Sequence, residues 1–529
     1  MDTHSQAVQT IAETVRNFFQ LGESYRVSHG SSNSTRPGHG ATKQNVVDIS
    51  KLSNVLHVDT ERRVALVEPN VPMDRLVEAT LLYGLVPPVV MEFPGITVGG
   101  GFSGTSGESS SFRHGFFDDT VDWVEMVLGN GDIVQASREE RGDLFRGAAG
   151  AVGTLGMVTL VELRLVAARR FVMTTYRRVG RVGEAVGEIE RLVGEGGVDY
   201  IDGIVFGPEH SVVITGELTD TKPEGCGLRT FSNPEDPWFY MHVEDKTRDL
   251  GVEDPTVVEY IPLGEYLFRY DRAGFWVGRQ GYTYFKLIPF TKFFRWLLDD
   301  YSHTRTLYHA LHAGGIASQF VVQDLALPYD TAEDFINWVD KELGIWPLWL
   351  CPLRGCPLPT FHPVTSLASS CKDKDGDRDT PKPNGQESQQ SQPMLNIGVW
   401  GWGPRDYGRF VAQNRALEEK LAKLGGRKWL YAHTYYTEEE FWTEYDHRAQ
   451  YERLRAKYFA TTLPSVYDKV KVKLDPGALA AGWKNPLSQW DSEFWLSLWP
   501  IGGLYGMVKA TLSGDISLHR QAKWRYKGE

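Results

Sequence analysis

Apolar residues recur at helical spacing at the start of the chain and at strand spacing soon afterwards. Between Val8 and Phe19 they lie three or four positions apart, which predicts an amphipathic helix over residues 5–20. From about residue 25 to 165 the pattern changes to short runs rich in valine, leucine and isoleucine, separated by glycine. The pair Asn130–Gly131 lies between two such runs and is a strong signal of a β-hairpin. This part of the chain is therefore predicted to be a β-rich domain that follows an opening helix.

Beyond residue 168 strand-like and helical patterns are mixed, and aromatic residues are frequent. The pattern breaks at 366–393, which is polar and repetitive in serine, glutamine, aspartate and lysine. That stretch has too few apolar residues to order itself, so a disordered surface insertion is expected there. The other elements predicted are a helix from Met73 to Gly84, strands at 210–218 and 315–328, and helices from Thr331, at 408–424 and at 438–458.

These changes of pattern divide the chain into six segments. They are an N-terminal helix (1–24), a β-rich domain (25–168), a mixed α/β domain in two pieces (169–365 and 394–472), the insertion between those pieces (366–393) and a C-terminal extension (473–529). A chain of 529 residues is too long for one ordinary hydrophobic core, so two or three domains are expected.

Charge and cysteine content argue against a nucleic-acid partner and against a bound metal ion. The formal net charge is −12, and no strongly basic run is present, so no nucleic-acid partner is predicted. Cys351, Cys356, His362 and Cys371 lie close in sequence, but their spacing fits no compact zinc template. No metal site is predicted, and the cysteines are expected to be the reduced thiols of an intracellular protein.

Neither a secretory signal nor a membrane-spanning segment is predicted. The N-terminus has no basic region followed by an apolar one, and no apolar run reaches 18 residues. The longest candidate, 494–508, is interrupted by proline and glycine, and its tryptophans fit a bilayer surface and a docked tail equally well. The stretch 287–300 fits an interfacial helix as well as a core helix. A cytoplasmic location is predicted, and peripheral membrane contact stays open.

Residues 93–111 read FPGITVGGGFSGTSGESSS, in which Gly99–Gly104 matches G-x-G-x-x-G. A Rossmann fingerprint would follow a buried strand and open a helix. Pro94–Gly95 shortens any preceding strand, and the residues after Gly104 are poor helix formers. The Rossmann hypothesis therefore fails, although the glycines would still let backbone N–H groups approach a diphosphate closely.

Two further loops of small residues support a diphosphate site. Residues 28–35 read SHGSSNST, and Gly153–Gly156 lead directly into a strand-like run. Each loop alone is more often an ordinary surface turn. All three in this order, within one β-rich domain, indicate backbone that surrounds a diphosphate.

The order SHGSSNST, PGITVGGGFSGTSGESSS, LGNGDIV and DLFRGAAGAVGTLGMVTLVELRL resembles the FAD-binding domain of the vanillyl-alcohol-oxidase/PCMH flavoprotein superfamily. Phrases such as PWFYMHVED, LYAHTYYTEEEFW and LPSVYDKV resemble the Diminuto/seladin family of delta-24-sterol reductases. The resemblance runs from about 25 to 472. It implies an α+β fold, with a two-lobed PCMH-type FAD-binding domain and an α/β substrate (cap) domain whose C-terminal segment returns over the flavin.

The resemblance implies an FAD-dependent reductase that takes hydride from NADPH and reduces the double bond between carbons 24 and 25 of a sterol or sterol-like lipid. It also implies the endoplasmic reticulum as the membrane of any peripheral contact. An FAD-dependent alcohol oxidase or dehydrogenase of the wider superfamily is the alternative. The residues implied to bind FAD are Ser28, His29, Gly30, Ser31, Ser32, Asn33, Ser34, Pro94, Gly95, Thr97, Val98, Gly99, Gly100, Gly101, Phe102, Ser103, Gly104, Thr105, Ser106, Gly107, Glu108, Ser109, Gly153, Thr154, Gly156 and Val158.

The first loop bears on how FAD is held. Many superfamily oxidases tether FAD to a histidine in an R-x-G-G-H-type loop, and here that loop reads S-H-G-S-S-N-S. Serines occupy the attachment point, so non-covalent FAD is predicted. His29 lies at least one position before the place of the histidine that bonds FAD in those oxidases. A shift of the loop could bring it there, so a covalent bond between His29 and FAD stays open.

A proton donor is predicted in the segment LYAHTYYTEEEFW. If that segment is a strand, Tyr431, His433 and Tyr435 share one face, and His433 and Tyr435 are the preferred donors. The alternative is that all three are packing aromatics. Asp324, after a buried run, fits a strand-end cap or ion-pair partner better than a catalytic role. The aromatic-rich stretch 266–301 fits a sterol-sized cavity or a core layer.

Overall fold

The computed structural model describes residues 2–29, 45–251, 255–314, 319–366, 391–472, 474 and 499–528. The chain opens with helix α1 (Asp2–Leu21), whose Val8, Ile11, Ala12 and Val15 are buried, as the helical spacing predicts. His4 on the same helix bonds Glu68 at 2.7 Å, which ties α1 to the domain behind it.

The first lobe is built around a five-stranded sheet of order β3-β4-β8-β6-β7, in which every pairing is antiparallel. The hairpin predicted at Asn130–Gly131 joins β6 to β7, with Gly131 at a φ of +85°. The strands are β3 (Val55–Asp59), β4 (Val64–Val67), β6 (Val121–Val127), β7 (Ile133–Ser137) and β8 (Met157–Arg164). Two small sheets join β1 (Arg26–Ser28) to β2 (Val46–Asp48) and β5 (Leu85–Val86) to β9 (Val166–Ala167). The helices are α2 (Met73–Leu81), α3 (Val98–Gly104), α4 (Ser111–His114), η1 (Phe117–Thr120) and α5 (Gly142–Ala148).

The second lobe is built around an eight-stranded antiparallel sheet of order β13-β10-β12-β11-β15-β16-β14-β17. Its strands are β10 (Phe171–Val179), β11 (Tyr200–Gly207), β12 (His210–Thr219), β13 (Thr256–Pro262), β14 (Phe320–Leu327), β15 (Leu348–Leu353), β16 (Met394–Trp402) and β17 (Arg427–Lys428). Both lobes therefore combine sheets with helices, and the predicted α+β class is confirmed.

The two faces of this sheet have different neighbours. On β14, Val321, Leu325 and Leu327 belong to a core cluster shared with helices α6 (Val182–Glu195), α12 (Tyr329–Glu342) and α13 (Tyr407–Lys423). Phe320, Val322 and Ala326 belong instead to the main core, which continues into the first lobe. Because side chains alternate along a strand, Asp324 also lies on the face turned toward the first lobe.

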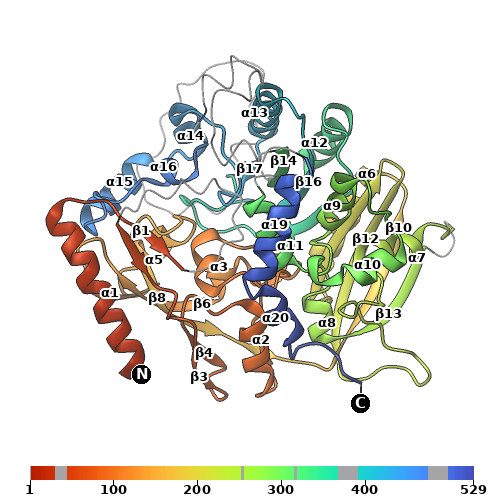
Figure 1. Ribbon diagram of the computed structural model, residues 1–529, viewed down its shortest axis with the longest axis horizontal. Helices are drawn as coiled ribbons and strands as arrows, with labels where there is room; N and C mark the ends of the chain where they lie inside the picture. Colours follow the sequence, from red (N-terminus) through yellow and green to blue (C-terminus); the bar gives the residue numbers. More distant parts are fainter. Residues whose placement is uncertain are drawn as a thin grey trace.

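The remaining helices surround this frame (Figure 1). They are α7 (Phe239–Thr247), α8 (Leu263–Leu267), α9 (Val277–Phe285), α10 (Lys292–Leu297), η2 (Asp299–Tyr301), α11 (Thr304–Ala313), α14 (Glu438–Glu444), α15 (Arg448–Lys457), α16 (Val466–Val470), α19 (Ile501–Leu512) and α20 (Asp515–Arg520). The single helix predicted at 438–458 is two helices, because the chain bends at Tyr445–His447. Residues 367–390 of the predicted insertion lie outside the described residues.

Candidate functional site

The glycine run forms a short helix of its own. Helix α3 begins after Thr97, whose hydroxyl oxygen accepts a hydrogen bond from the Gly100 N–H at 3.2 Å. It ends at Thr105, whose backbone is left-handed with a φ of 52°. No strand occupies the described residues 87–96, which agrees with exclusion of the Rossmann fold. A helix formed by the glycines themselves was not predicted from the residue pattern.

Helix α3 has a packed side and an open side. A Cβ on Gly101 would come within 2.6 Å of Met91 Cε and 2.9 Å of Phe117 Cδ1, so no side chain fits there. A Cβ on Gly104 would meet no atom of the described residues within 4 Å. The open side leaves backbone accessible to an anionic ligand, while the packed side fixes the helix on the core.

The side chains of Val98 and Phe102 are fully buried in the main core, so they hold α3 in place. Pro94 is also committed to the protein, because its carbonyl oxygen accepts a hydrogen bond from Arg305 at 3.1 Å. Val98, Phe102 and Pro94 can therefore contribute only backbone atoms to FAD binding, and that contribution stays a prediction.

The third loop contacts the end of α3. Val152, at a φ of +45°, donates its N–H to the carbonyl oxygen of Ser103 at 3.2 Å, and Gly153 follows at +73°. Thr154 turns inward, where its hydroxyl accepts a hydrogen bond from Tyr451 at 2.7 Å. A Cβ on Gly156 would lie 2.8 Å from the carbonyl oxygen of Val127. Gly153 is thus beside the glycine helix, whereas Thr154 and Gly156 serve the packing of the loop.

The first loop is only partly described. Ser28 ends β1, where it pairs with Asp48, and His29 follows it. Gly30, Ser31, Ser32, Asn33 and Ser34 lie outside the described residues. Their approach to the other two loops, and non-covalent attachment of FAD, stay predictions.

The segment after β17 returns to the glycine loop, as the resemblance implies. Trp429 donates its indole N–H to the carbonyl oxygen of Thr105 at 2.9 Å. A Cβ on Gly107 would lie 3.3 Å from the same indole. However, residues 429–435 form turns and a bridge instead of a strand. The expectation that Tyr431, His433 and Tyr435 share one strand face is therefore wrong.

Tyr431 forms a half-buried pair with Asp324. The tyrosine hydroxyl donates to Asp324 Oδ2 at 2.5 Å, and the Asn396 amide donates to Oδ1 at 3.2 Å. Burial raises the pKa of Asp324 to about 6, although both hydrogen bonds oppose the shift. Asp324 is therefore not a strand-end cap, because it lies within β14, and it forms no ion pair with any of the described residues.

His433 and Tyr435 have different surroundings. Burial, together with Lys428 and His312, lowers the pKa of His433 to about 4, so its imidazole is neutral near pH 7. Tyr435 packs in the cluster on the far face of the eight-stranded sheet, and its N–H donates to Glu418 at 3.0 Å. Tyr431 packs instead against the main core. The structure brings Tyr431, and not Tyr435, to the face that carries Asp324.

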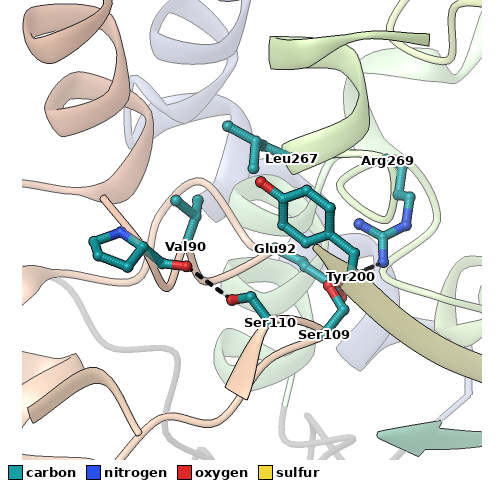
Figure 2. A pocket seen from close by; sticks show the side chains of 8 residues that line it. Val90, Glu92, Ser109, Ser110, Tyr200, Leu267 and Arg269 are labelled. Atoms are coloured by element: carbon teal, nitrogen blue, oxygen red, sulfur yellow. Dashed lines mark hydrogen bonds and ion pairs between the residues drawn. The ribbon is translucent and has the colours of Figure 1, made fainter. Parts of the chain in front are cut away.

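A second buried network joins the two lobes (Figure 2). The Arg269 guanidinium contacts Glu92 Oε1 at 2.8 Å and Asp202 Oδ2 at 2.9 Å. Ser109, predicted to bind FAD, lies in this network and donates its hydroxyl to Glu92 at 3.3 Å. Figure 2 shows Val90, Glu92, Ser109 and Ser110 of the first lobe around a small cavity, opposite Tyr200, Leu267 and Arg269 of the second.

Protonatable acids are concentrated between the lobes. Burial raises the pKa of Glu92 to about 7, with Arg269 opposing the shift. Desolvation, with Glu92 and Asp324 nearby, raises the pKa of Glu108 well above its usual range. Together with Asp324 these groups can hold protons near pH 7, in the region where the glycine loop meets the eight-stranded sheet.

Comparisons with known proteins agree with this geometry. Residues 5–137 match a family described as an FAD binding domain. Delta(24)-sterol reductase of Homo sapiens is 28% identical over 486 residues, which cover 88% of this chain and 86% of the human protein. The protein of the same name from Pisum sativum is 28% identical over 466 residues, covering 80% and 76%, and a homolog from Caenorhabditis elegans is 24% identical over 458 residues, covering 81% and 79%.

The chain is similar to the delta(24)-sterol reductases over most of its length. These matches confirm the predicted superfamily and FAD as the cofactor, and they indicate an FAD-dependent oxidoreductase. Among the described residues, none of the helices is both long and apolar enough to cross a bilayer.

The described residues fit FAD. The open side of Gly104 lies at the end of α3 that Val152 contacts, which leaves backbone available to a diphosphate. Within the described part of the chain, three buried oxygens between the lobes have no hydrogen-bond donor. These atoms are Glu92 Oε2, Asp202 Oδ1 and Asn396 Oδ1. Buried acceptors are normally satisfied, so a bound group with N–H donors suits this face.

Proposed function

We propose that this chain reduces the double bond between carbons 24 and 25 of a sterol or sterol-like isoprenoid, with hydride that comes from NADPH. The names of its relatives support the substrate class, and the half-buried Asp324–Tyr431 pair beside the glycine loop supports the reaction. When bound, FAD supplies the hydride transfer, which leaves the protein to bind, orient and protonate.

Tyr431 is the proton donor in this proposal, and Asp324 is the group that resupplies it. Reduction of an alkene adds a hydride to one carbon and a proton to the other. The Tyr431 hydroxyl gives its proton to carbon and takes one from the protonated Asp324 carboxyl, which becomes a carboxylate. With a pKa near 6, Asp324 is protonated in a useful fraction of molecules near neutral pH and can regain its proton from water. His433 and Tyr435 stay predicted donors.

Aromatic side chains next to this pair suit an apolar substrate. Trp349 and Trp400 lie on the same face of the sheet as Asp324. Phe275 packs on both, with ring centroids 5.1 Å and 4.3 Å away. A closed apolar wall of this kind excludes water and binds hydrocarbon by the area it buries.

The test uses the purified protein with FAD under anaerobic conditions. Addition of NADPH and a sterol with a carbon 24–25 double bond, such as desmosterol, is expected to bleach the flavin and then restore its colour, with a sterol product two mass units heavier. NADH in a parallel arm establishes the preferred nucleotide. Flavin that ignores both nucleotides but is reduced by an alcohol would overturn the proposal in favour of an alcohol oxidase or dehydrogenase.

A substrate of this class dissolves in membranes. We therefore include peripheral contact with the endoplasmic reticulum membrane, from the cytoplasmic side, in the proposal. Fractionation of cells that express the full chain tests this location, since recovery in a washed soluble fraction alone would contradict it.

A further inference from the structure

Helix α19 presents its bulky apolar side chains outward and its small ones inward. Gly502, Gly506 and Ala510, spaced four residues apart, are buried. The exposed residues on the opposite side include Val508, 56% exposed, and Leu512, 76% exposed. A helix on a water-facing surface normally does the reverse, because apolar side chains gain free energy by leaving water.

The small residues allow close contact between two helices. A Cβ on Gly506 would overlap the carbonyl oxygen of Ala310 on α11, and a Cβ on Gly314 would lie 2.7 Å from the carbonyl oxygen of Gly502. Small residues at every fourth position are the packing device of helices in lipid, where bulky side chains face the hydrocarbon. Helix α19 follows that rule, although it is only twelve residues long.

Segments next to α19 carry more exposed apolar side chains. The indole N–H of Trp499, just before α19, donates to the carbonyl oxygen of Tyr284 on α9 at 2.7 Å. Figure 1 shows α19 beside α11. Helix α10 is joined to α9 by the Tyr282 hydroxyl, which donates to the carbonyl oxygen of Phe294 at 3.1 Å. We call the exposed apolar residues of 286–297 and 499–512 the α10–α19 surface. They are Leu287, Phe293, Trp296, Leu297, Trp499, Ile501, Leu504, Tyr505, Val508 and Leu512.

The charges of the two segments have one sign. Residues 286–297 and 499–512 contain Lys286, Lys292, Arg295 and Lys509 and no acid, in a chain whose net charge is −12. The Lys509 ammonium lies 5.5 Å from the Tyr505 ring centroid, within the surface. Glu235, which accepts a hydrogen bond from Trp296 at 3.2 Å, borders the surface. Tryptophan, tyrosine and basic residues around an apolar centre are the composition of a bilayer-facing site.

An apolar pocket lies between α19, α9 and α11, beneath the α10–α19 surface. Gly503 and Met507 of α19 line it together with Tyr284 and Phe285 of α9 and Leu311 of α11. The lining is almost entirely hydrocarbon and aromatic, so the pocket suits part of a lipid and not a nucleotide.

We propose that the α10–α19 surface rests on the surface of a bilayer that contains anionic lipid, with the apolar pocket open to that bilayer. A second copy of the chain fits less well, because a two-fold symmetric contact would bring the four cations against their own copies. The docking does not depend on the reaction proposed above. Substrate entry through the pocket does, and it rests on that proposed function.

The experiment measures vesicle binding of the full chain with FAD. Vesicles of phosphatidylcholine alone and of phosphatidylcholine with 30% phosphatidylserine are floated with the wild type and with Leu504→Asp/Leu512→Asp. Binding is expected to be stronger with phosphatidylserine and to fall at least tenfold in the double variant. The matched control is Leu21→Asp/Leu82→Asp, which places the same charges at exposed leucines elsewhere and is expected to bind as the wild type does.

Further measurements separate effects on folding from effects on lipid contact. FAD content and thermal unfolding should be unchanged in both double variants, because only exposed side chains differ. Lys286→Gln/Lys292→Gln/Lys509→Gln should lower binding to the phosphatidylserine vesicles on the order of a hundredfold, because each basic group near such a surface adds about fivefold. Brominated lipid should quench tryptophan fluorescence in the wild type.

Equal binding by the leucine variant and the wild type would overturn the proposal. It would also be overturned if light scattering shows a dimer that this variant dissociates, because the surface would then join two copies. Failure of the sterol assay in detergent, with vesicle binding intact, would refute the proposed function alone.

Discussion

A glycine-to-alanine substitution is expected to have opposite effects on the two sides of α3. Gly101→Ala adds a methyl group where Met91 and Phe117, both fully buried, leave 2.6 Å and 2.9 Å, so one of them must move. Overpacking of this kind costs about 1–3 kcal/mol. Gly104→Ala adds the same methyl group where none of the described residues has an atom within 4 Å.

Both alanines gain a similar helix propensity, about 0.5–1 kcal/mol, because both lie in α3. That gain cancels in a comparison of the two variants. The difference in unfolding free energy between them is therefore expected to equal the overpacking cost of about 1–3 kcal/mol, with Gly101→Ala the less stable.

FAD affinity is expected to follow the opposite order. If the open side of Gly104 faces the diphosphate, its methyl group blocks close approach, and Gly104→Ala weakens FAD binding at least tenfold while the apoprotein stays stable. The assays are denaturant unfolding of the apoprotein and FAD titration followed by flavin fluorescence. Wild-type FAD affinity in Gly104→Ala would refute the placement of the cofactor on that side of α3.

Three other perturbations test the site. Tyr431→Phe should lower the rate of alkene reduction by about 10²–10⁴-fold without slowing flavin reduction by NADPH. The control Tyr435→Phe should change neither rate by more than about twofold. Stopped-flow absorbance measures the two half-reactions separately. Because the pKa of Asp324 is raised to about 6, its protonated form is lost as pH rises, and turnover of the wild type should fall above pH 6. If turnover of Asp324→Asn falls with the same slope, Asp324 does not resupply the proton of Tyr431. Arg269→Leu leaves Glu92 and Asp202 buried without their cation and should lower stability by about 3–5 kcal/mol, with Arg269→Lys less affected in thermal unfolding.

Local signals in the sequence predicted the features that depend on a few neighbouring residues. The Asn130–Gly131 turn fixes its hairpin by the conformations those two residues allow, and the spacing of Val8, Ile11 and Val15 fixes the buried side of α1. The residue types around the glycine run also distinguish it from a Rossmann turn, and its part in FAD binding stays a prediction.

Long-range pairing could not be predicted in this way. Asp324 and Tyr431 are 107 positions apart, and their contact depends on the order of strands in the eight-stranded sheet. An acid at an inward position of β14, between Val322 and Ala326, was a usable signal, since a buried strand seldom carries a charge without a purpose. Strand periodicity misled for Tyr431, His433 and Tyr435, because alternation of aromatic residues also occurs in turns.

The return of the chain to the glycine loop also sets an order for biosynthesis. Trp429 bonds Thr105 across 324 positions, and Tyr451 bonds Thr154 across 297. At ribosomal rates of about 5–20 residues per second, the glycine loop waits roughly 15–65 s for Trp429 to be made. During that interval the nascent first lobe lacks the contacts that hold the glycine loop. We therefore expect FAD to be retained only near the end of translation, and a chain that stalls before residue 429 is expected to retain it poorly.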